Sequence, residues 1–564
     1  MFTNKFWEEF AMKPKARSIQ AFIWILGILF LCGSESYSAN PSALSGTVRS
    51  TAEGRMEGVL VSAKREGSNM TVAVVSDSQG RYAFPGDRLQ PGDYHLKIRA
   101  IGYDLDDPGV VKVESNKTAQ HDLKLQKTKD LASQLTNAEW FLSNPEIKKR
   151  LIDGMRGAYP HNCIGCHAIS VITKSQYDAQ AWPSIVDRMW DYTEASIYQP
   201  GEVRVPDKGP RMLQTKPISA ELAEFLSSIN LSSRANGKWN FELKTLPRVK
   251  GRSTKVLITE YDLPRRECQP HDAVVASDGM VWYTDVGNGY LGRLNPRTGE
   301  VKEWPVPNPK PGSTIGTFDI KFDPEGNPWV GIAHQPGVAK FDKRTEKFTT
   351  WGGSGGGMLA LSPDGTVWGR DSSNATKLDP KTGETVKYPF PKQLPGIPWS
   401  LRFYGVEADS QGNLYNASLQ SGLIGELNAK TGQWALYPTP TPDSGPRRAD
   451  MDRHDRFWFA EYYAGKIGMF DPKTKQFKEW DVPPTPWSGP YDVVVDKNGE
   501  VWAGGEFTDN VFRLNPANGQ VTTYPLPTLE MNVQRIDVDN STTPVTVWAG
   551  ENHRAKIVKV EPLD

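Results

Sequence analysis

The stretch PHDAVVASDGMVWYTDVGNGYLGRLNPRTGEVKEWP, residues 270–305, decides the fold of most of the chain. It divides into four short runs of strand-forming residues. The turn Asp278-Gly279 lies before the aromatic run Val281-Trp282-Tyr283, and glycine in such a hairpin turn can adopt a positive φ. A second turn, Asn295-Pro296-Arg297-Thr298-Gly299, ends the third run, and the fourth ends in Trp304-Pro305. The pattern predicts one four-stranded antiparallel unit.

The unit recurs along the chain. An aromatic residue closing a short strand returns about every 44 residues, which is typical of a β-propeller, at Trp282, Trp329, Trp368, Tyr415, Trp458, Trp502 and Trp548. After Trp548 the chain provides only one more strand, Lys556 to Val560. Ile258 to Pro264 has the pattern of a fourth strand, but no blade precedes it to which it could belong. We expect it to complete the last blade and close the ring, which leaves no open sheet edge. The prediction is a seven-bladed propeller over residues 251–564.

Residues 40–127 contain short alternating strands separated by turn clusters, which predicts a small antiparallel β-sandwich. The expected strands are Val59 to Ala63, Val72 to Val75, Tyr82 to Phe84, Tyr94 to Ile98 and His121 to Leu125. The motifs Gly80-Arg81-Tyr82-Ala83-Phe84 and Leu89-Gln90-Pro91-Gly92-Asp93-Tyr94 make the segment similar to the carboxypeptidase regulatory-like domain. The resemblance implies a structural or binding module without catalytic residues.

Residues 128–231 change to a helical period, with apolar residues three and four apart. Helices are predicted at Leu131 to Leu142, Ile147 to Met155, Trp182 to Tyr192 and Ser219 to Ile229. The segment 232–250, which contains Gly, Asn and basic residues, is predicted to be a linker. The predicted fold class is therefore mainly β: an N-terminal sandwich, a small α-helical domain and a C-terminal propeller.

The helical segment contains Cys163-Ile164-Gly165-Cys166-His167, the spacing of covalent c-type haem attachment. Two thiols three positions apart can reach both vinyl groups, and the adjacent His167 can bind the iron. The segment from Asn137 to Leu231 resembles a small class I cytochrome c, a family in which a methionine before the last helix is the distal ligand. By that resemblance Met212 is the expected second iron ligand, with Met189 as the alternative. The predicted cofactor is one covalent haem c.

Composition excludes some partners. The chain of 564 residues has 66 Lys plus Arg and 66 Asp plus Glu, so no basic excess exists to attract nucleic acid. Basic residues precede the apolar run Ile19 to Cys32, and small polar residues follow it, which predicts a secretory signal over residues 1–39. An uncleaved membrane anchor is the alternative, although the run is short for a bilayer span. We expect a periplasmic or secreted protein with no membrane span after signal cleavage.

One mouth of the propeller is expected to collect polar side chains. First strands should begin there at His271, Phe318, Tyr404, Arg448, Tyr491 and Arg535. Second strands should end there at Asp285, His334, Arg370, Asp371, Glu461, Glu506, Glu551 and His553. A ring of His, Glu and Arg is able to hold a divalent cation or perform acid and base chemistry. The alternative is that these residues only solvate a channel.

The repeat resembles the virginiamycin B lyase (streptogramin lyase) family. Pro270-His271-Asp272, Phe457-Trp458-Phe459-Ala460-Glu461 and Lys466-Ile467-Gly468 are similar to its blade motif. In that family a Mg-dependent site at the mouth opens a cyclic depsipeptide by elimination. The resemblance implies Glu551 as a magnesium ligand and His553 as the base, with His271 or His334 as a possible catalytic partner.

Three functions follow from these features. The first is electron transfer, in which the haem domain serves a redox partner protein and the propeller binds or oxidises a substrate. The second is a lyase that carries an accessory cytochrome. The third is a binding scaffold for a small molecule, peptide or glycan. The presence of a haem motif favours the first, because a lyase needs no haem.

Overall fold

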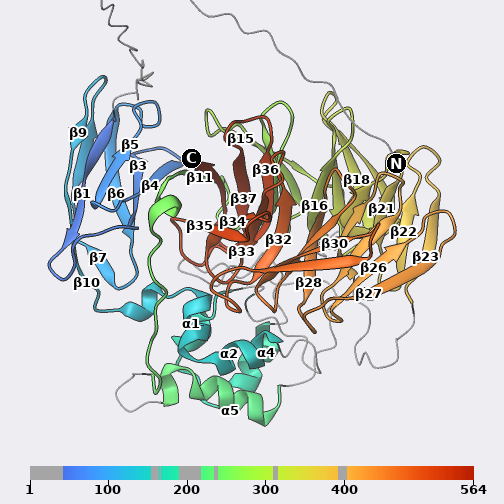
Figure 1. The fold of residues 1–564 in the computed structure, drawn as a ribbon, viewed down its shortest axis with the longest axis horizontal. Helices are drawn as coiled ribbons and strands as arrows, with labels where there is room; N and C mark the ends of the chain where they lie inside the picture. Colours follow the sequence, from blue (N-terminus) through green and yellow to red (C-terminus); the bar gives the residue numbers. More distant parts are fainter. Residues whose placement is uncertain are drawn as a thin grey trace, which may run out of the picture. The chain divides into compact units, whose positions relative to one another are not determined.

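Each repeat of the sequence folds as a four-stranded antiparallel sheet (Figure 1). The computed structural model describes residues 42–153, 164, 167–189, 218–233, 239–308, 315–391 and 403–564. Six full blades follow one another along the chain. The first three are β12 (Pro270–Val275), β13 (Val281–Asp285), β14 (Tyr290–Leu294) and β15 (Val301–Pro305); β16 (Thr317–Phe322), β17 (Pro328–Ile332), β18 (Gly337–Asp342) and β19 (Lys347–Gly352); and β20 (Gly356–Leu361), β21 (Val367–Arg370), β22 (Asn374–Leu378) and β23 (Thr385–Pro389).

The next three blades have the same order. They are β24 (Phe403–Ala408), β25 (Leu414–Ser418), β26 (Leu423–Leu427) and β27 (Trp434–Pro438); β28 (Pro446–Met451), β29 (Phe457–Glu461), β30 (Lys466–Asp471) and β31 (Gln476–Asp481); and β32 (Pro490–Val495), β33 (Val501–Gly505), β34 (Asn510–Asn515) and β35 (Gln520–Pro525). The recurring tryptophans are buried in the blades, and several donate the indole N–H to an aspartate of the preceding turn. Trp458 donates to Asp452 at 2.9 Å and Trp502 to Asp496 at 3.0 Å. The repeat period thus reflects the burial of one aromatic side chain at the same place in each blade.

The seventh blade closes the ring as the sequence predicts. It contains β36 (Val533–Asp539), β37 (Thr546–Glu551) and β38 (Lys556–Pro562), and its outer strand is β11 (Val256–Asp262) from the start of the propeller. Ile258 pairs with Val560 and Glu260 with Val558 in the antiparallel ladder. The two ends of the propeller are therefore joined by a full set of backbone hydrogen bonds.

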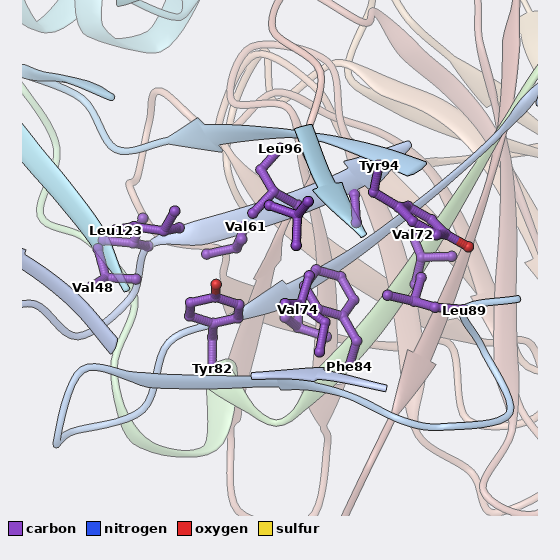
Figure 2. Packing of buried hydrophobic residues seen from close by; sticks show 14 of the residues in the cluster. Val48, Val61, Val72, Val74, Tyr82, Phe84, Leu89, Tyr94, Leu96 and Leu123 are labelled. Carbon is purple, nitrogen blue, oxygen red and sulfur yellow. The ribbon is translucent and has the colours of Figure 1, made fainter. Parts of the chain in front are cut away.

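The N-terminal module has two sheets around one apolar core. Its strands are β1 (Leu44–Ser50), β2 (Gly54–Arg55), β3 (Leu60–Arg65), β4 (Met70–Val75), β5 (Arg81–Phe84), β6 (Gly92–Arg99), β7 (Tyr103–Leu105), β8 (Val110–Val113), β9 (Ala119–Gln120) and β10 (Leu123–Lys127). Figure 2 shows Val61, Val74 and Leu96 packed with Tyr82 and Phe84 in this core. Alternating burial along β5 and β6 agrees with the period-two pattern of the sequence.

The sandwich and the propeller share one sheet. β4 pairs antiparallel with the free edge of β11, so that β36-β37-β38-β11-β4-β3-β6-β8 form a continuous eight-stranded sheet. Leu257 lies opposite Val74 and Glu260 opposite Thr71. The outer edge of blade seven is thus covered by the sandwich, which removes an exposed strand edge.

The helical segment is short in its described parts. It contains the 3-10 turn η1 (Leu131–Gln134) and helices α1 (Asn137–Ser143), α2 (Pro145–Leu151), α3 (Ser170–Thr173), α4 (Trp182–Met189) and α5 (Ala220–Ser228), followed by η3 (Leu231–Ser233). Thr136 and Glu139 form a capping box at α1, and Asn144 and Ser219 cap α2 and α5. None of the helices in the described ranges is long and apolar enough to cross a membrane.

The segment predicted as a linker makes specific contacts in its described part, residues 239–250. The Lys244 N–H donates to Ser143 Oγ at 2.8 Å, and the Leu246 N–H donates to Glu139 Oε1 at 2.8 Å. Arg248 donates to the Glu57 carbonyl of the sandwich at 3.0 Å. Residues 41–564 accordingly form one compact unit. The predicted signal, residues 1–39, lies outside the described residues.

Candidate functional site

The mouth of the propeller gathers the beginnings of the first strands. His271, in β12, lies with its ring centroid 4.6 Å from that of Phe318 and 6.2 Å from that of Tyr491. Tyr404 hydrogen-bonds to Tyr491 through the two hydroxyls, and His334 lies 5.8 Å from Phe318. The structure thus places five of the residues named from the sequence in one aromatic cluster.

His271 is held by the residue that follows it. Its Nδ1 lies 2.6 Å from Asp272 Oδ1, and its Nε2 lies 3.4 Å from the Tyr491 hydroxyl. Asp272 is fully buried and accepts from Arg448 at 2.8 Å. Burial opposes ionisation, but Arg448, His271 and Arg535 together hold the pKa of Asp272 below its usual range. An ionised Asp272 favours the tautomer of His271 in which Nδ1 carries the proton.

A second arginine, which the sequence reasoning missed, lies beside the pair. The guanidinium carbon of Arg447 is 3.5 Å from the ring centroid of Tyr491 and 4.2 Å from that of Tyr462. Its NH1 donates to Glu506 Oε2 at 3.2 Å. Burial raises the pKa of Tyr491 well above its ordinary value, although Arg447 acts in the opposite direction. The mouth therefore holds a histidine, two tyrosine hydroxyls and a buried cation.

Below the mouth the channel is filled by ion pairs. Arg535 donates to Asp319 at 2.7 Å, and its NH1 lies 3.6 Å from Asp272 Oδ2. Arg448 NH1 lies 3.6 Å from Asp319 Oδ1. Arg448 and Arg535, both named from the sequence, thus lie in the channel and hold the aspartates under His271.

Glu551 lies at the end of β37, inside blade seven. Its carboxyl is completely buried, and neither oxygen has a hydrogen-bond partner among the described residues. Burial, and next the charge of Glu260, raise the pKa of Glu551 well above its ordinary value, and Lys556 opposes them only in part. His553 is buried in the following turn, where its backbone N–H donates to the Met531 carbonyl at 3.1 Å.

The other second-strand ends differ from one another. Asp285 pairs with Arg265 at 2.5 Å, Asp371 with Lys387 at 3.1 Å, and Glu506 with Arg447. Burial raises the pKa of Glu461 to about 8. Arg370 ends β21 and is half-buried. These residues are distributed over separate blades and do not form one catalytic group.

Within the described ranges, no group of three or more His, Cys, Asp or Glu side chains is arranged to hold a metal ion. The surroundings of Glu551 do not suit Mg²⁺, because Lys556 lies beside it and donates to Glu260 at 2.9 Å. An ammonium group in that place competes with a divalent cation for the same carboxylates. Magnesium stays a prediction from the resemblance.

The haem residues are only partly described. Cys163, Cys166 and Met212 lie outside the described residues. His167 is buried, its Nδ1 lies 2.9 Å from the Ala168 carbonyl oxygen, and burial lowers its pKa. Met189, the alternative ligand, ends α4 and is half-buried. The covalent haem c therefore stays a prediction.

The helical segment covers the mouth over blades five, six and seven. The Ala138 N–H donates to the Phe507 carbonyl at 2.8 Å, and Lys148 Nζ donates to the Tyr463 carbonyl at 2.9 Å. Asn532 Nδ2 donates to the Ile164 carbonyl at 3.2 Å and to Glu506 Oε1 at 2.8 Å. His271 is only 3% exposed beneath this cover.

Two family models match the chain. Residues 397–563 match the virginiamycin B lyase family, and residues 43–126 match the carboxypeptidase regulatory-like domain. The ring is a virginiamycin B lyase-like propeller. None of the curated proteins matches the chain.

Several solved structures are similar to about half of the chain. A streptogramin B lyase is 22% identical with a TM-score of 0.49, and covers 55% of this chain and 99% of its own. Virginiamycin B lyase from Staphylococcus aureus is 19% identical with a TM-score of 0.47, and covers 54% of this chain and 99% of its own. The extracellular domain of a putative hybrid two-component system from B. thetaiotaomicron is 13% identical with a TM-score of 0.41, covering 53% of this chain and 39% of its own. Likeness of this extent does not define a reaction.

These comparisons overturn the electron-transfer function. Neither matching family model is a cytochrome; they describe a lyase family and a regulatory-like module. The prediction of a mono-haem cytochrome that transfers electrons to or from the propeller is therefore wrong. The physical reason is that the five-residue motif specifies only local chemistry, whereas the larger modules determine what the chain does. The lyase and the scaffold fit these findings better.

Proposed function

We propose that the propeller is a lyase that opens an ester-linked cyclic peptide by elimination, with His271 as the base. The observation that carries the proposal is the buried pair of His271 and Asp272 at the mouth, with Nδ1 and Oδ1 2.6 Å apart. The match of residues 397–563 to the virginiamycin B lyase family supports the reaction class.

The pair provides a base of defined orientation. Asp272 accepts the Nδ1 proton, so the lone pair of Nε2 points toward Tyr491. In the reaction Nε2 takes the proton from the carbon next to a substrate carbonyl. The electrons of that C–H bond form a carbon–carbon double bond, the bond from the adjacent carbon to the ester oxygen breaks, and a carboxylate leaves. No water is consumed, and the opened product has the composition of the substrate.

Arg447 and the two tyrosines complete the arrangement. The negative charge that develops on the substrate carbonyl oxygen needs a donor or cation close by in a site of low dielectric. Arg447 lies over the Tyr491 ring, and the Tyr404 and Tyr491 hydroxyls lie beside His271. These groups are positioned to stabilise that charge.

A binding scaffold is the second candidate. The observation that favours it is the helical cover, because α1 and α2 contact blades five and six directly over the cluster. A permanently covered mouth binds no substrate at His271. In that case recognition by the chain occurs elsewhere on its surface.

The test uses the purified full chain and quinupristin, the ligand present in a structure of a catalytically inactive histidine-to-alanine virginiamycin B lyase from Staphylococcus aureus. Ring opening is followed by liquid chromatography and mass spectrometry. The lyase predicts a linear product of unchanged mass, lost in His271→Ala and strongly reduced in Asp272→Asn. His454→Ala, at an exposed turn, is the matched control and keeps full activity. Absence of product with the folded parent chain favours the scaffold.

A further inference from the structure

A groove of about 490 Å³ lies where the sandwich joins blade seven. Its floor is the continuous sheet. His95, Lys64, Thr71 and Glu260 lie opposite one another on β6, β3, β4 and β11. Directly paired residues in antiparallel strands point to the same face, so the four side chains share it. The other face carries Ala63, Val72 and Leu96 into the sandwich core.

The wall of the groove is fixed in place. The Thr528 N–H donates to Glu260 Oε1 at 3.1 Å, and its hydroxyl donates to Glu260 Oε2 at 2.9 Å. Arg99 donates to the Thr528 carbonyl at 3.4 Å and lies 3.5 Å from Asp509. The groove is therefore preformed, and its volume lies in the range of small-molecule sites.

Positive charge predominates in the lining. The charged residues there are Lys64, Arg65, Lys97 and Lys556 against Glu66 and Glu260, with His95 beside them. Glu260 is already paired with Lys556 at 2.9 Å. Lys97 is exposed and forms no ion pair among the described residues, whereas Lys64 is paired with Asp262. Lys97 is thus available to a ligand, with Lys64 and Lys556 in the same lining.

The lining also limits the class of ligand. Its hydroxyls are those of Ser62, Thr71 and Thr528, and it contains no Phe, Tyr or Trp. A sugar ring usually needs an aromatic surface for stacking, whereas carboxylate and phosphate oxygens need cations and hydroxyls. The lining therefore suits a small anion better than a neutral glycan.

We propose that this groove binds a small ligand with two or more anionic oxygen groups, carboxylate or phosphate. Lys97 pairs with one anionic group, Lys64 and Lys556 add positive charge at the same face, and the Ser62 and Thr71 hydroxyls hydrogen-bond to the ligand. The groove is lined from both modules, with Lys97 on the sandwich and Lys556 on blade seven. A bound anion therefore stabilises their junction. The proposal is independent of the reaction at the mouth.

The test is calorimetric titration of the full chain at low ionic strength, with citrate in one arm and pyrophosphate in the other. We expect saturable 1:1 binding of at least one probe, and the stronger arm identifies the anionic group. Lys97→Glu should weaken that binding about tenfold or more. Lys124→Glu is the matched control, because Lys124 is an exposed lysine of β10 in the other sheet; its binding should equal that of the parent chain.

Two results overturn the proposal. One is the absence of saturable binding of both probes to the parent chain. The other is an equal affinity of Lys97→Glu and Lys124→Glu for the probe, whether or not it is lower than that of the parent chain. Equal affinities would show that the probe responds only to the general charge of the surface. Hydrogen exchange gives an independent readout: the bound probe should slow exchange along the paired strands β4 and β11 in the parent chain and not in Lys97→Glu.

Discussion

Arg448→Met should destabilise the propeller strongly, because Arg448 holds two buried aspartates in the channel. The side chain is 2% exposed, and its guanidinium donates to Asp272 at 2.8 Å and 3.3 Å and lies 3.6 Å from Asp319. Methionine fills similar volume but leaves Arg535 as the only arginine beside the two carboxylates. Removing one partner of a buried ion pair costs about 3–5 kcal/mol. We expect a loss of that size in the free energy of unfolding at pH 7.

The assay is urea unfolding followed by tryptophan fluorescence, since recurring tryptophans lie in the blades. The loss should shrink as the pH falls toward 4, because Asp272 then takes a proton in the variant. The pKa of Asp272 is lower in the folded protein than in the unfolded chain. Ionised Asp272 therefore stabilises the fold at pH values above its unfolded pKa, and this stabilisation is lost as the pH falls. The double variant Arg448→Met with Asp272→Asn should lose less than the two single variants together. A loss below about 0.5 kcal/mol at pH 7, the range of ordinary surface changes, would refute the reasoning.

Three further predictions concern stability and the cover. The urea midpoint should fall between pH 5 and pH 8, because burial raises the pKa of Glu407 to about 7 and of three aspartates to about 6, Asp450, Asp492 and Asp537. These acids stabilise the fold when they are protonated, and this stabilisation is complete below pH 4 and is lost as the pH rises. A constant or rising midpoint contradicts this account. Thr259→Pro removes a ladder N–H from β11, between β38 and β4, and should speed proteolytic release of the sandwich; an unchanged cleavage rate contradicts the shared sheet. Asn532→Ala leaves the Ile164 carbonyl without its amide donor at a cost of about 1–3 kcal/mol, and should speed hydrogen exchange in α1; unchanged exchange contradicts the cover.

The propeller could be predicted from the sequence because its signal is local and repeated. Each blade buries an aromatic residue at the same place in its second strand, so the spacing of residues such as Trp458 and Trp502 reports the blade period. The unmatched strand at Ile258 then followed from counting strands. The sandwich strands were also predictable, because their burial alternates with period two.

Contacts between modules left no comparable signal. The pairing of β4 with β11 uses backbone groups, and the facing residues Val74 and Leu257 resemble any other strand residues. The helical cover depends on single contacts such as Ala138 with Phe507. Interactions of this kind join residues hundreds of positions apart and have no period.

The candidate site was predicted in part for a similar reason. When the blades are aligned on the aromatic residue of the second strand, one residue of each first strand is assigned to the mouth of the propeller. His271 and Arg448 were found in this way. The first strands are irregular at that end, with register shifts between Pro270 and Asp272 and between Pro446 and Ala449. Two consecutive residues then reach the site. Asp272 and Arg447 were missed because the alignment assumed a regular strand; the adjacent charged pairs were the signal available.

The most direct test of the proposed lyase is the fate of the proton that His271 is expected to remove. The substrate is quinupristin deuterated at the carbon next to the carbonyl of the ester-bearing residue. The account predicts that the opened product loses this deuterium, that the rate is slower than with ordinary substrate, and that His271→Ala gives no product. An opened product that keeps the deuterium and gains the mass of one water would contradict elimination and the role assigned to His271.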